Sequence, residues 1–468
     1  MAGLDFFLGG NFLLFNSLDF FLFLLVVFTV YWTVPNVYRK VWLISASVFF
    51  YGFWSIGFLF HFLGILAFNY LFYYFAHGSY TKAKVSFLVV VNLFNLAIFK
   101  YLIFFETILH DLGFSIQVAY PLKDFVLPLA ISFYTFQIIA FHIDCYRGEL
   151  KEKVSPEDFF FFILFFPQLI AGPIIRWAEL KRQIDRNKLP HADLLRTGSV
   201  LIFFGLLKKV VIGDQLGTLI DPVFQSPEKY NQAAILLSTY GFAVQIYSDF
   251  SGYSDIARGL AILLGFNIPR NFDTPYFATT LQEFWQRWHI TLSRWLRDYL
   301  YIPLGGNKSG KIHTYVNLLL TMLLGGLWHG ANYNFLIWGG MHGLFLAIER
   351  PFVGTFQKYS KFWQLGIRSF IIFHFVCITW IFFRSSNLRD AIVFFEGFTR
   401  NVGSNLSNNS LAGWLIFAAI VLHIFERNYR KLDFVTRKFW LLPAFGIALF
   451  ALFPSTVTNV MTFIYFQF

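Results

Sequence analysis

The chain has 468 residues, of which 57% are hydrophobic and 13% are charged, and its formal net charge is +11. Soluble domains carry about 25% charged residues, so this composition excludes an ordinary soluble protein. The apolar residues form runs of about 17–22 residues, long enough to cross a bilayer, whereas a membrane β-barrel needs alternating segments of about ten. The basic residues fall in short loops instead of one face, which argues against a nucleic-acid partner. The composition predicts an all-α polytopic protein of the lipid bilayer.

The predicted spans fill a single membrane domain over residues 1–468, with C-terminal helices over 391–468. Several spans are short enough to be tilted, re-entrant or buried inside the bundle, so we expect about 11–13 crossings. The spans cover residues 18–35, 42–54, 57–76, 85–105, 126–145, 158–175, 196–212, 232–248, 254–267, 313–327, 331–349, 364–383, 411–426 and 439–453.

The charges of the first five loops predict the orientation. Placing the N-terminus outside leaves only Lys123 in the outer loops, with Lys100 at a span end. The inner loops then carry Arg39, Lys40, Lys82, Lys84, Arg147, Lys151 and Lys153. Since Lys and Arg concentrate in cytoplasmic loops, we expect an extracytoplasmic N-terminus. The N-terminus has no basic region followed by a small-residue cleavage site, so we expect the first span, and not a removable signal peptide, to direct insertion.

Polar residues and helix breakers interrupt the spans of the first half. We expect His142 and Asp144, in AFHIDCYRG, to anchor the end of a span. The stretch FFPQLIAGPIIR has two prolines and a glycine, which predict an interrupted span that ends near Arg176. Cys145 and Cys377 lie in or beside apolar runs, where two buried thiols are favoured over one disulfide, so redox chemistry is not indicated.

The stretch QIYSDFSGYSDIA places two carboxylates at membrane depth, which is costly unless they pair or face water. Its polar residues either support a polar interior or contact a substrate; they are Asp249, Ser251, Ser254 and Asp255. The candidate partners of the carboxylates are Arg258, Arg287 and Arg294.

Residues 281–300, LQEFWQRWHITLSRWLRDYL, predict one amphipathic helix. Its apolar residues recur at spacings of three and four, and Gln282, His289 and Ser293 group on one flank of that stripe. Trp285, Trp288 and Trp295 suit an interface. We expect this helix to lie at the membrane surface or to line a wet cavity.

Two histidines stand among the glycines of GGLWHGANYNFLIWGGMHG. His329 follows Gly325 and Gly326 and precedes Gly330, so the helix can break there around a restricted cavity. Its neutral imidazole is either a general base or a structural hydrogen-bonding group. For His342 we favour packing. His289 is either an interfacial histidine or a second polar group of the same cavity, and His374 is expected to bond a neighbouring helix. No phosphate loop, zinc spacing or Gly-x-Ser-x-Gly elbow is present, so no metal is expected.

Several of these stretches, taken in order, resemble a known family. LPLAISFYTFQIIAFHIDCYRG, FFPQLIAGPIIR, QIYSDFSGYSDIARG, WQRWHITLSRWLRDYLYIPLGG, the histidine stretch and WIFFR are similar to the bacterial alginate O-acetyltransferase branch of the membrane-bound O-acyltransferases. The resemblance covers residues 12–390 and implies a catalytic core over about 125–350. It implies a fold of membrane and re-entrant helices around a central tunnel, in the inner membrane of a bacterium.

The resemblance also implies an activity and its residues. His329 matches the catalytic histidine of the family, and His289 matches the second histidine of this branch. The residues expected to contact substrate or support the cavity are Gln282, Trp285, Trp288, Ser293, Trp328, Asn332, Asp249 and Ser251. The donor would be acetyl-CoA or another acyl thioester, with no tightly bound cofactor. An extracytoplasmic hydrolase-like acyltransferase would complete the transfer to alginate, cellulose or peptidoglycan.

Three other functions compete with polysaccharide O-acetylation. A sister group of the same family transfers D-alanine to a cell-envelope polymer. A transporter or flippase would use the histidines for protons or substrate, although it often shows internal repeats that are not visible here. A scaffold subunit of an export complex would not need His329.

Overall fold

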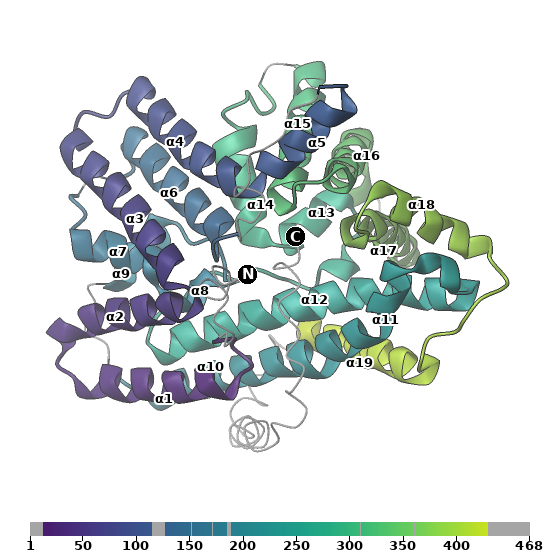
Figure 1. Ribbon diagram of the computed structural model, residues 1–468, viewed down its shortest axis with the longest axis horizontal. Coiled ribbons are helices and arrows are strands. Elements are labelled where there is room, and N and C mark those ends of the chain that lie inside the picture. Colours follow the sequence, from purple (N-terminus) through teal and green to yellow (C-terminus); the bar gives the residue numbers. More distant parts are fainter. Residues whose placement is uncertain are drawn as a thin grey trace. The chain divides into compact units, whose positions relative to one another are not determined.

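The computed structural model describes residues 13–114, 127–150, 152–170, 172–184, 189–308, 310–358 and 361–428. Over these ranges the chain is helical, and the only strand-like pairing is an isolated bridge between Tyr230 and Ser404. This confirms the all-α prediction. Figure 1 shows the helices coloured in chain order. The chain divides into two compact units. Of the described residues, the first unit holds those up to Ile202 and Ile256–Pro269, and the second holds Phe203–Asp255 and those from Arg270.

The first unit is built mostly from hydrophobic helices, several of which start at a short polar side chain. Ser17, Ser55 and Thr81 each accept a hydrogen bond from the backbone N–H three residues later, which satisfies an otherwise unpaired amide. The helices are α1 (Leu18–Thr33), α2 (Asn36–Trp54), α3 (Ile56–Ala76), α4 (Lys82–Lys100), α5 (Leu102–Asp111), α6 (Ile131–Tyr146), α7 (Pro156–Leu164), α8 (Phe166–Leu169), α9 (Trp177–Ile184) and α10 (Ala192–Leu206), the last of which runs into the second unit.

A chain of polar side chains joins three helices inside this unit. The fully buried His142 of α6 bonds the Tyr80 hydroxyl through Nδ1 (2.8 Å) and the Asn69 side chain of α3 through Nε2 (3.0 Å). Asn69 and Asn92 of α4 then exchange side-chain amide bonds. Such bonds hold helices together where water is absent. His142 thus has the structural role that its position near a span end suggested.

The predicted interruption after residue 165 is present. α7 ends before Phe165, and Pro167 lies in the single turn of α8. The Gln168 amide donates to the carbonyls of Phe162 and Ile163, which the break leaves without helical partners. The predicted span 439–453 and the loop residues Lys123 and Lys151 lie outside the described residues.

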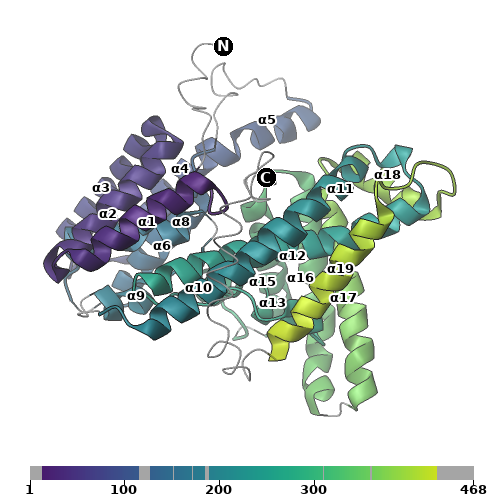
Figure 2. The same ribbon diagram turned by 90° about the horizontal axis from the view of Figure 1, so that it is seen from below.

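The second unit carries the histidine stretch. Its helices are α11 (Gln215–Gln225), α12 (Gln232–Leu263), α13 (Leu281–Arg287), α14 (Ile290–Leu296), α15 (Lys311–His329), α16 (Tyr333–Lys358), α17 (Phe362–Arg384), α18 (Leu388–Glu396) and α19 (Asn409–Asn428). Its shorter segments are π-helical at Leu207–Asp214 and Arg297–Tyr301 and 3₁₀ at Pro227–Lys229, Pro275–Phe277 and Gly397–Thr399. α16 and α17 lie side by side in both views (Figure 2).

One predicted boundary is wrong. The sequence separated spans 232–248 and 254–267 at the polar stretch, but α12 continues through it from Gln232 to Leu263 and contributes to both units. The stretch stays helical because its buried carboxylates have partners on neighbouring segments. Gly252 allows the close approach that this requires, since a side chain there would overlap the carbonyl of Gly205.

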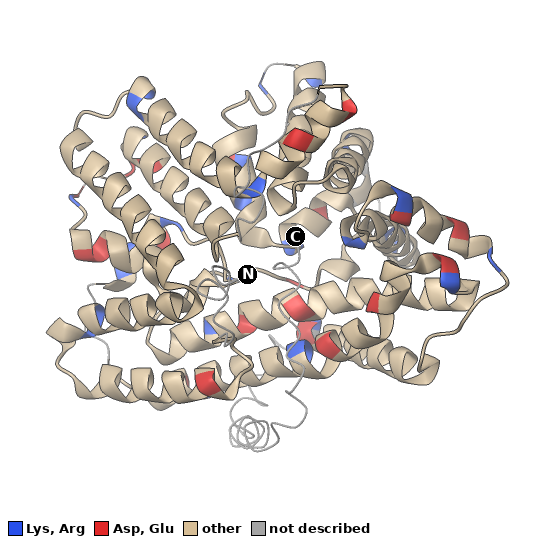
Figure 3. Cartoon of the chain, in the orientation of Figure 1, with Lys and Arg blue, Asp and Glu red and all other residues tan. Residues whose placement is uncertain are grey.

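The described helices have the character of membrane helices. Four are long and apolar enough to cross a bilayer, namely Ile56–Ala76, Lys82–Lys100, Trp363–Arg384 and Asn409–Arg427, and the shorter Leu18–Thr33 is also apolar. Charged residues are sparse along the helices (Figure 3). The chain is therefore a multi-pass membrane protein. The 11–13 crossings expected from the sequence would also require helices that are shorter or more polar than these, so that number stays a prediction.

Candidate active site

The segment after α12 holds His289 in an unusual conformation. The predicted helix 281–300 is not continuous: α13 ends at Arg287, and His289 adopts a left-handed backbone before α14 begins. Asn271 stabilises this break. Its side-chain oxygen accepts bonds from the backbone N–H (3.2 Å) and the hydroxyl (3.0 Å) of Thr291, and its carbonyl accepts from Ile290 N–H (2.9 Å). A side chain distant in sequence thus caps α14.

The same Asn271 oxygen determines which ring nitrogen of His289 carries the proton. His289 Nδ1 lies 3.1 Å from this oxygen, which can only accept, so Nδ1 carries the proton and Nε2 the lone pair of the neutral ring. The imidazole is fully buried and meets the Phe250 ring edge-on at 4.7 Å. Burial lowers the pKa of His289 to about 3, so the ring is neutral at cellular pH.

His329 is the last residue of α15, where the chain turns toward α16. Gly330 is extended, and a side chain there would overlap the Phe335 ring. The His329 side chain is enclosed by rings, with centroid distances of 5.0 Å to Trp328, 5.2 Å to Trp338 and 5.3 Å to Phe383. The residue is only 4% exposed. The end of the helix therefore presents the imidazole to a tight aromatic enclosure.

Trp328 connects the two histidines. Its ring centroid lies 6.0 Å from His289 and 5.0 Å from His329, so it contacts both imidazoles. Trp288 lies fully buried beside His289, at 5.1 Å from Trp380. The structure thus brings together four predicted site residues that come from two distant stretches: Trp288, His289, Trp328 and His329.

His342 is fully engaged in hydrogen bonds. Its Nδ1 accepts from the Trp285 indole N–H (3.3 Å), and its Nε2 lies 3.0 Å from the Thr379 hydroxyl. Thr379 donates to the Val376 carbonyl, so it accepts from Nε2–H. This arrangement supports the packing role expected for His342.

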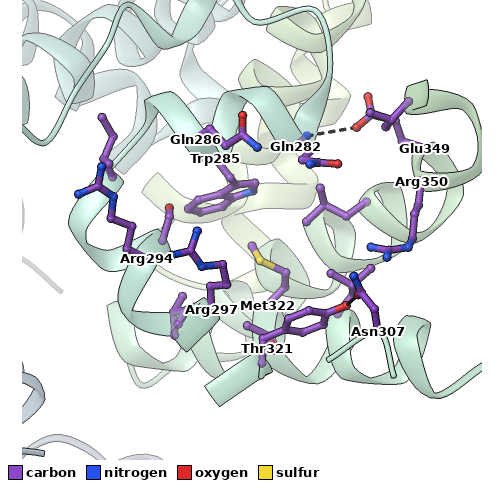
Figure 4. Close-up of a pocket in the computed structure, with 17 residues that line it drawn as sticks. Gln282, Trp285, Gln286, Arg294, Arg297, Asn307, Thr321, Met322, Glu349 and Arg350 are labelled. Atoms are coloured by element: carbon purple, nitrogen blue, oxygen red, sulfur yellow. Dashed lines mark hydrogen bonds between the residues drawn. The ribbon is translucent and has the colours of Figure 1, made fainter. Parts of the chain in front are cut away.

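A pocket of about 560 Å³ lies against Trp285 (Figure 4). The predicted residues Gln282, Trp285 and Ser293 line it, together with three arginines, Arg294, Arg297 and Arg350. In the view of Figure 4, Arg294 and Arg297 lie toward one end and Arg350 toward the other. Glu349 closes one wall and accepts bonds from the Leu281 and Gln282 amides at the start of α13.

The floor of this pocket is aromatic. The Trp285 ring lies 5.7 Å from Trp338, which in turn lies 5.2 Å from His329. Neither His289 nor His329 is among the residues that line the pocket. The rings of Trp285 and Trp338 therefore lie between the pocket and the His329 imidazole.

Three other predicted site residues lie apart from this enclosure or have a visible structural role. Asn332 donates to the Ser386 carbonyl (2.8 Å) and accepts from the Asn334 amide (3.0 Å), so it shapes the turn into α16. Asp249 pairs with Lys209 (2.6 Å). The buried Ser251 hydroxyl has no hydrogen-bond partner within the described part of the chain.

Lysines pair with the carboxylates of α12. Arg258 bonds the Ile268 carbonyl and Arg287 pairs with Glu283, while the lysines of the π-helical stretch meet the carboxylates. Lys208 bridges Asp255 and Glu426, and Lys209 bridges Asp214 and Asp249; all these pairs lie within 2.5–2.7 Å. Both lysines are at least 98% buried.

Sequence reasoning missed several residues of the site. Lys208 and Lys209 stood inside a predicted span, where two adjacent cations in an apolar run were the available signal. Trp338, Trp380 and Phe383 looked like ordinary apolar residues, and only their positions around His329 distinguish them. Asn271 carried no signal, because its role depends on a contact 18 residues away.

Comparisons with known proteins identify relatives of this chain. A family model described as MBOAT, the membrane-bound O-acyltransferase family, matches residues 146–388. The chain is 40% identical to a probable alginate O-acetylase, AlgI, of Pseudomonas aeruginosa over 88% of this chain and 80% of the relative. It is 35% identical to a peptidoglycan O-acetyltransferase of Helicobacter pylori (85% and 82%) and 30% identical to a teichoic acid D-alanyltransferase of Bacillus subtilis (57% and 71%).

Proposed function

Because the chain belongs to the membrane-bound O-acyltransferase family and is an O-acyltransferase, we propose that it takes an acetyl group from a cytoplasmic thioester and passes it across the membrane. The acetyl group then modifies hydroxyls of an exported polysaccharide. Two relatives whose names specify alginate or peptidoglycan O-acetylation support this acceptor class.

The observation that carries the proposal is the enclosed imidazole of His329 at the end of α15. A hydroxyl is a weak nucleophile until a base removes its proton. His329 takes that proton while the hydroxyl oxygen forms a bond to the thioester carbonyl carbon. The carbon–sulfur bond then breaks, and the sulfur leaves as a thiol with the proton returned by the imidazolium. Neutral His289, which touches Trp328 from the other side, orients the reactants.

The donor uses the pocket lined by Arg294, Arg297 and Arg350. Thioester carriers such as coenzyme A bear phosphates, and arginine forks bind phosphate through paired hydrogen bonds. The thioester end would displace Trp285 to reach Trp338 and His329, since the Trp285 ring lies between the pocket and Trp338.

Substitution of two of these arginines tests the donor route. We expect the double variant Arg294→Gln, Arg350→Gln to raise KM for acetyl-CoA about tenfold or more with little change in kcat. Phosphate contacts that are equally strong in the bound substrate and in the transition state affect only binding. Arg389→Gln, an exposed arginine of α18, is the control. An unchanged KM would exclude this pocket as the donor site.

The acceptor side lies outside the cell. We infer that the N-terminus is extracytoplasmic, that the protein resides in the inner membrane, and that a separate hydrolase-like acyltransferase completes the transfer to the polymer. The positive loop residues Arg39, Lys40, Lys82 and Lys84 support this orientation.

Removal of the His329 imidazole tests the proposed function. We expect His329→Ala to abolish polymer acetylation while the protein still accumulates in the membrane, as judged by polymer-bound acetate and immunoblotting. His313→Ala, an exposed histidine on the same helix, should retain activity. Normal acetylation in the His329 variant would refute the assignment of the base.

D-alanine transfer is the second candidate, favoured by the 30% identity to the teichoic acid enzyme. Mass spectrometry of the modified polymer separates acetyl from D-alanyl esters. A transporter would release no thiol from a thioester, so a thiol assay on the purified protein distinguishes it from both transferases.

A further inference from the structure

Two buried tryptophans beside His329 hold indole N–H groups that are not satisfied. Trp338 and Trp380 are each 1% exposed, and within the described residues neither indole nitrogen has a hydrogen-bond partner. A buried donor without an acceptor costs about 1–3 kcal/mol, so such groups are rare and call for an explanation. Two of them occur within one ring stack.

Other indoles of this protein show that partners are normally found. Trp285 donates to His342 Nδ1, Trp32 to the Leu263 carbonyl (3.1 Å) and Trp42 to the Val27 carbonyl (3.1 Å). Trp338 and Trp380 differ from these three indoles in having no acceptor among the described residues.

The geometry places both indoles at the reacting centre. Trp338 meets the His329 ring edge-on, with an interplanar angle of 90° and a centroid distance of 5.2 Å. Trp380 stacks on Trp338 at 5.7 Å and 17°. Both rings also pack against Phe383, which itself contacts His329. A substrate oxygen that reached the imidazole would lie close to the Trp338 indole, with Trp380 as the next ring.

We propose that the indole N–H groups of Trp338 and Trp380 donate hydrogen bonds to the carbonyl oxygen of the acyl group being transferred. This inference rests on the proposed function. When the hydroxyl oxygen attacks the carbonyl carbon, the carbonyl π electrons move to its oxygen, which becomes an oxyanion. The two N–H groups stabilise that charge until the electrons return and the carbon–sulfur bond breaks.

The chemistry of the enclosure suits this role. Preorganised donors in a site without water stabilise developing charge more than donors in water do, because no solvent must reorient. The N–H groups have no competing acceptor among the described residues, so no hydrogen bond within the protein has to break when they bind the oxyanion.

An isosteric replacement tests the two roles against each other. We would replace Trp338 and Trp380, separately and in the full-length protein, by 3-benzothienylalanine, in which sulfur replaces the N–H at nearly constant shape. The same replacement at Trp414, which is 69% exposed on α19, is the matched control. Thiol release from acetyl-CoA gives kcat and KM, and S-ethyl-CoA, which lacks the carbonyl oxygen, probes donor binding.

We expect each replacement to lower kcat about 100-fold or more, while KM changes little and S-ethyl-CoA binds as in the wild type. The Trp414 control should keep its kcat. Trp338→Phe and Trp380→Phe should reproduce the loss of kcat if either isostere fails to incorporate. A kcat within about threefold of wild type in the isosteric variants would overturn the proposal and leave packing as the role of both rings.

The failure of the proposed function has a different signature. Wild-type protein would then release no thiol from any acyl thioester, or His329→Ala would release it at the wild-type rate. Either result would remove the reaction that the indoles are proposed to assist. Normal thiol release that depends on His329, with unaffected isosteric variants, overturns only the role of the indoles.

Discussion

The backbone of His289 is left-handed, with φ of 41° and ψ of 55°. A residue with a β-carbon loses about 1–2 kcal/mol in this conformation, and such strain concentrates at functional sites. Hydrogen bonds from Thr291 and Ile290 to Asn271 stabilise this strained conformation. The Asn271 side chain also orients the imidazole, through its bond with Nδ1. The tautomer and the orientation of His289 thus come from one neighbouring side chain.

Substitutions at His289 should separate backbone conformation from side-chain chemistry. Asparagine adopts the left-handed conformation readily and can donate to the Asn271 oxygen, whereas alanine does neither. We expect His289→Asn to retain measurable acetyl transfer and His289→Ala to lose about 100-fold or more of it, with a lower melting temperature. The transfer rate and the thermal unfolding of the purified variants provide the test. Equal losses in both variants would show that Asn271 does not position this residue.

The buried lysines add a second residue-scale feature. Lys208 and Lys209 together meet four carboxylates in the second unit, and the neighbouring Tyr247 hydroxyl donates to Glu426 (2.6 Å). Buried charges of this kind are tolerated only when they are paired and hydrogen-bonded. The network explains how α12 can carry Asp249 and Asp255 without breaking.

At the scale of elements, the contact between α15 and α16 determines where His329 lies. Gly326 and Gly339 let the two backbones touch, since a side chain at Gly326 would overlap the Phe335 carbonyl and one at Gly339 the Met322 carbonyl. Small residues commonly allow such approaches between membrane helices. The turn Gly330–Asn332 between the helices is therefore short and the imidazole lies directly beside Trp338.

A methyl group at Gly339 should disturb this contact. We expect Gly339→Ala to destabilise the protein by about 1–3 kcal/mol and to reduce acetyl transfer, because the helices must move apart. Gly354→Ala lies on the same helix with no atom near the new methyl, so it should be neutral or stabilising by up to about 1 kcal/mol. Equilibrium unfolding in mixed detergent micelles measures both. Equal stability of the two variants would contradict the close contact.

At the scale of the whole molecule, the distribution of basic residues supports the proposed orientation. Single cysteines at Phe114 and Lys153, both exposed within the first unit, should lie on opposite sides of the membrane. After Cys145 and Cys377 are replaced by serine, we expect an impermeant maleimide to label position 114 in intact cells and position 153 only after permeabilisation. The reverse pattern would invert the orientation.

The amino-acid sequence by itself determined the helical membrane class, the interrupted span near Pro167 and the stretches that hold His289 and His329. These features depend on local properties: the length of apolar runs, the effect of proline on a helix, and the cost of polar groups in hydrocarbon. Such properties are written in neighbouring residues. The sequence also ranked His342 and His374 as structural, and their hydrogen bonds to Trp285, Thr379 and Tyr240 support that ranking.

Only the tertiary structure decided which side chains meet. Asn271 breaks the predicted helix at His289, Lys208 and Lys209 pair with the carboxylates of α12, and Trp338 lies against His329 with Trp380 stacked on it. Each of these depends on residues brought together by packing. A periodic pattern reports the face on which a residue lies, but the partner across that face is chosen by shape and charge between helices, which no single stretch contains.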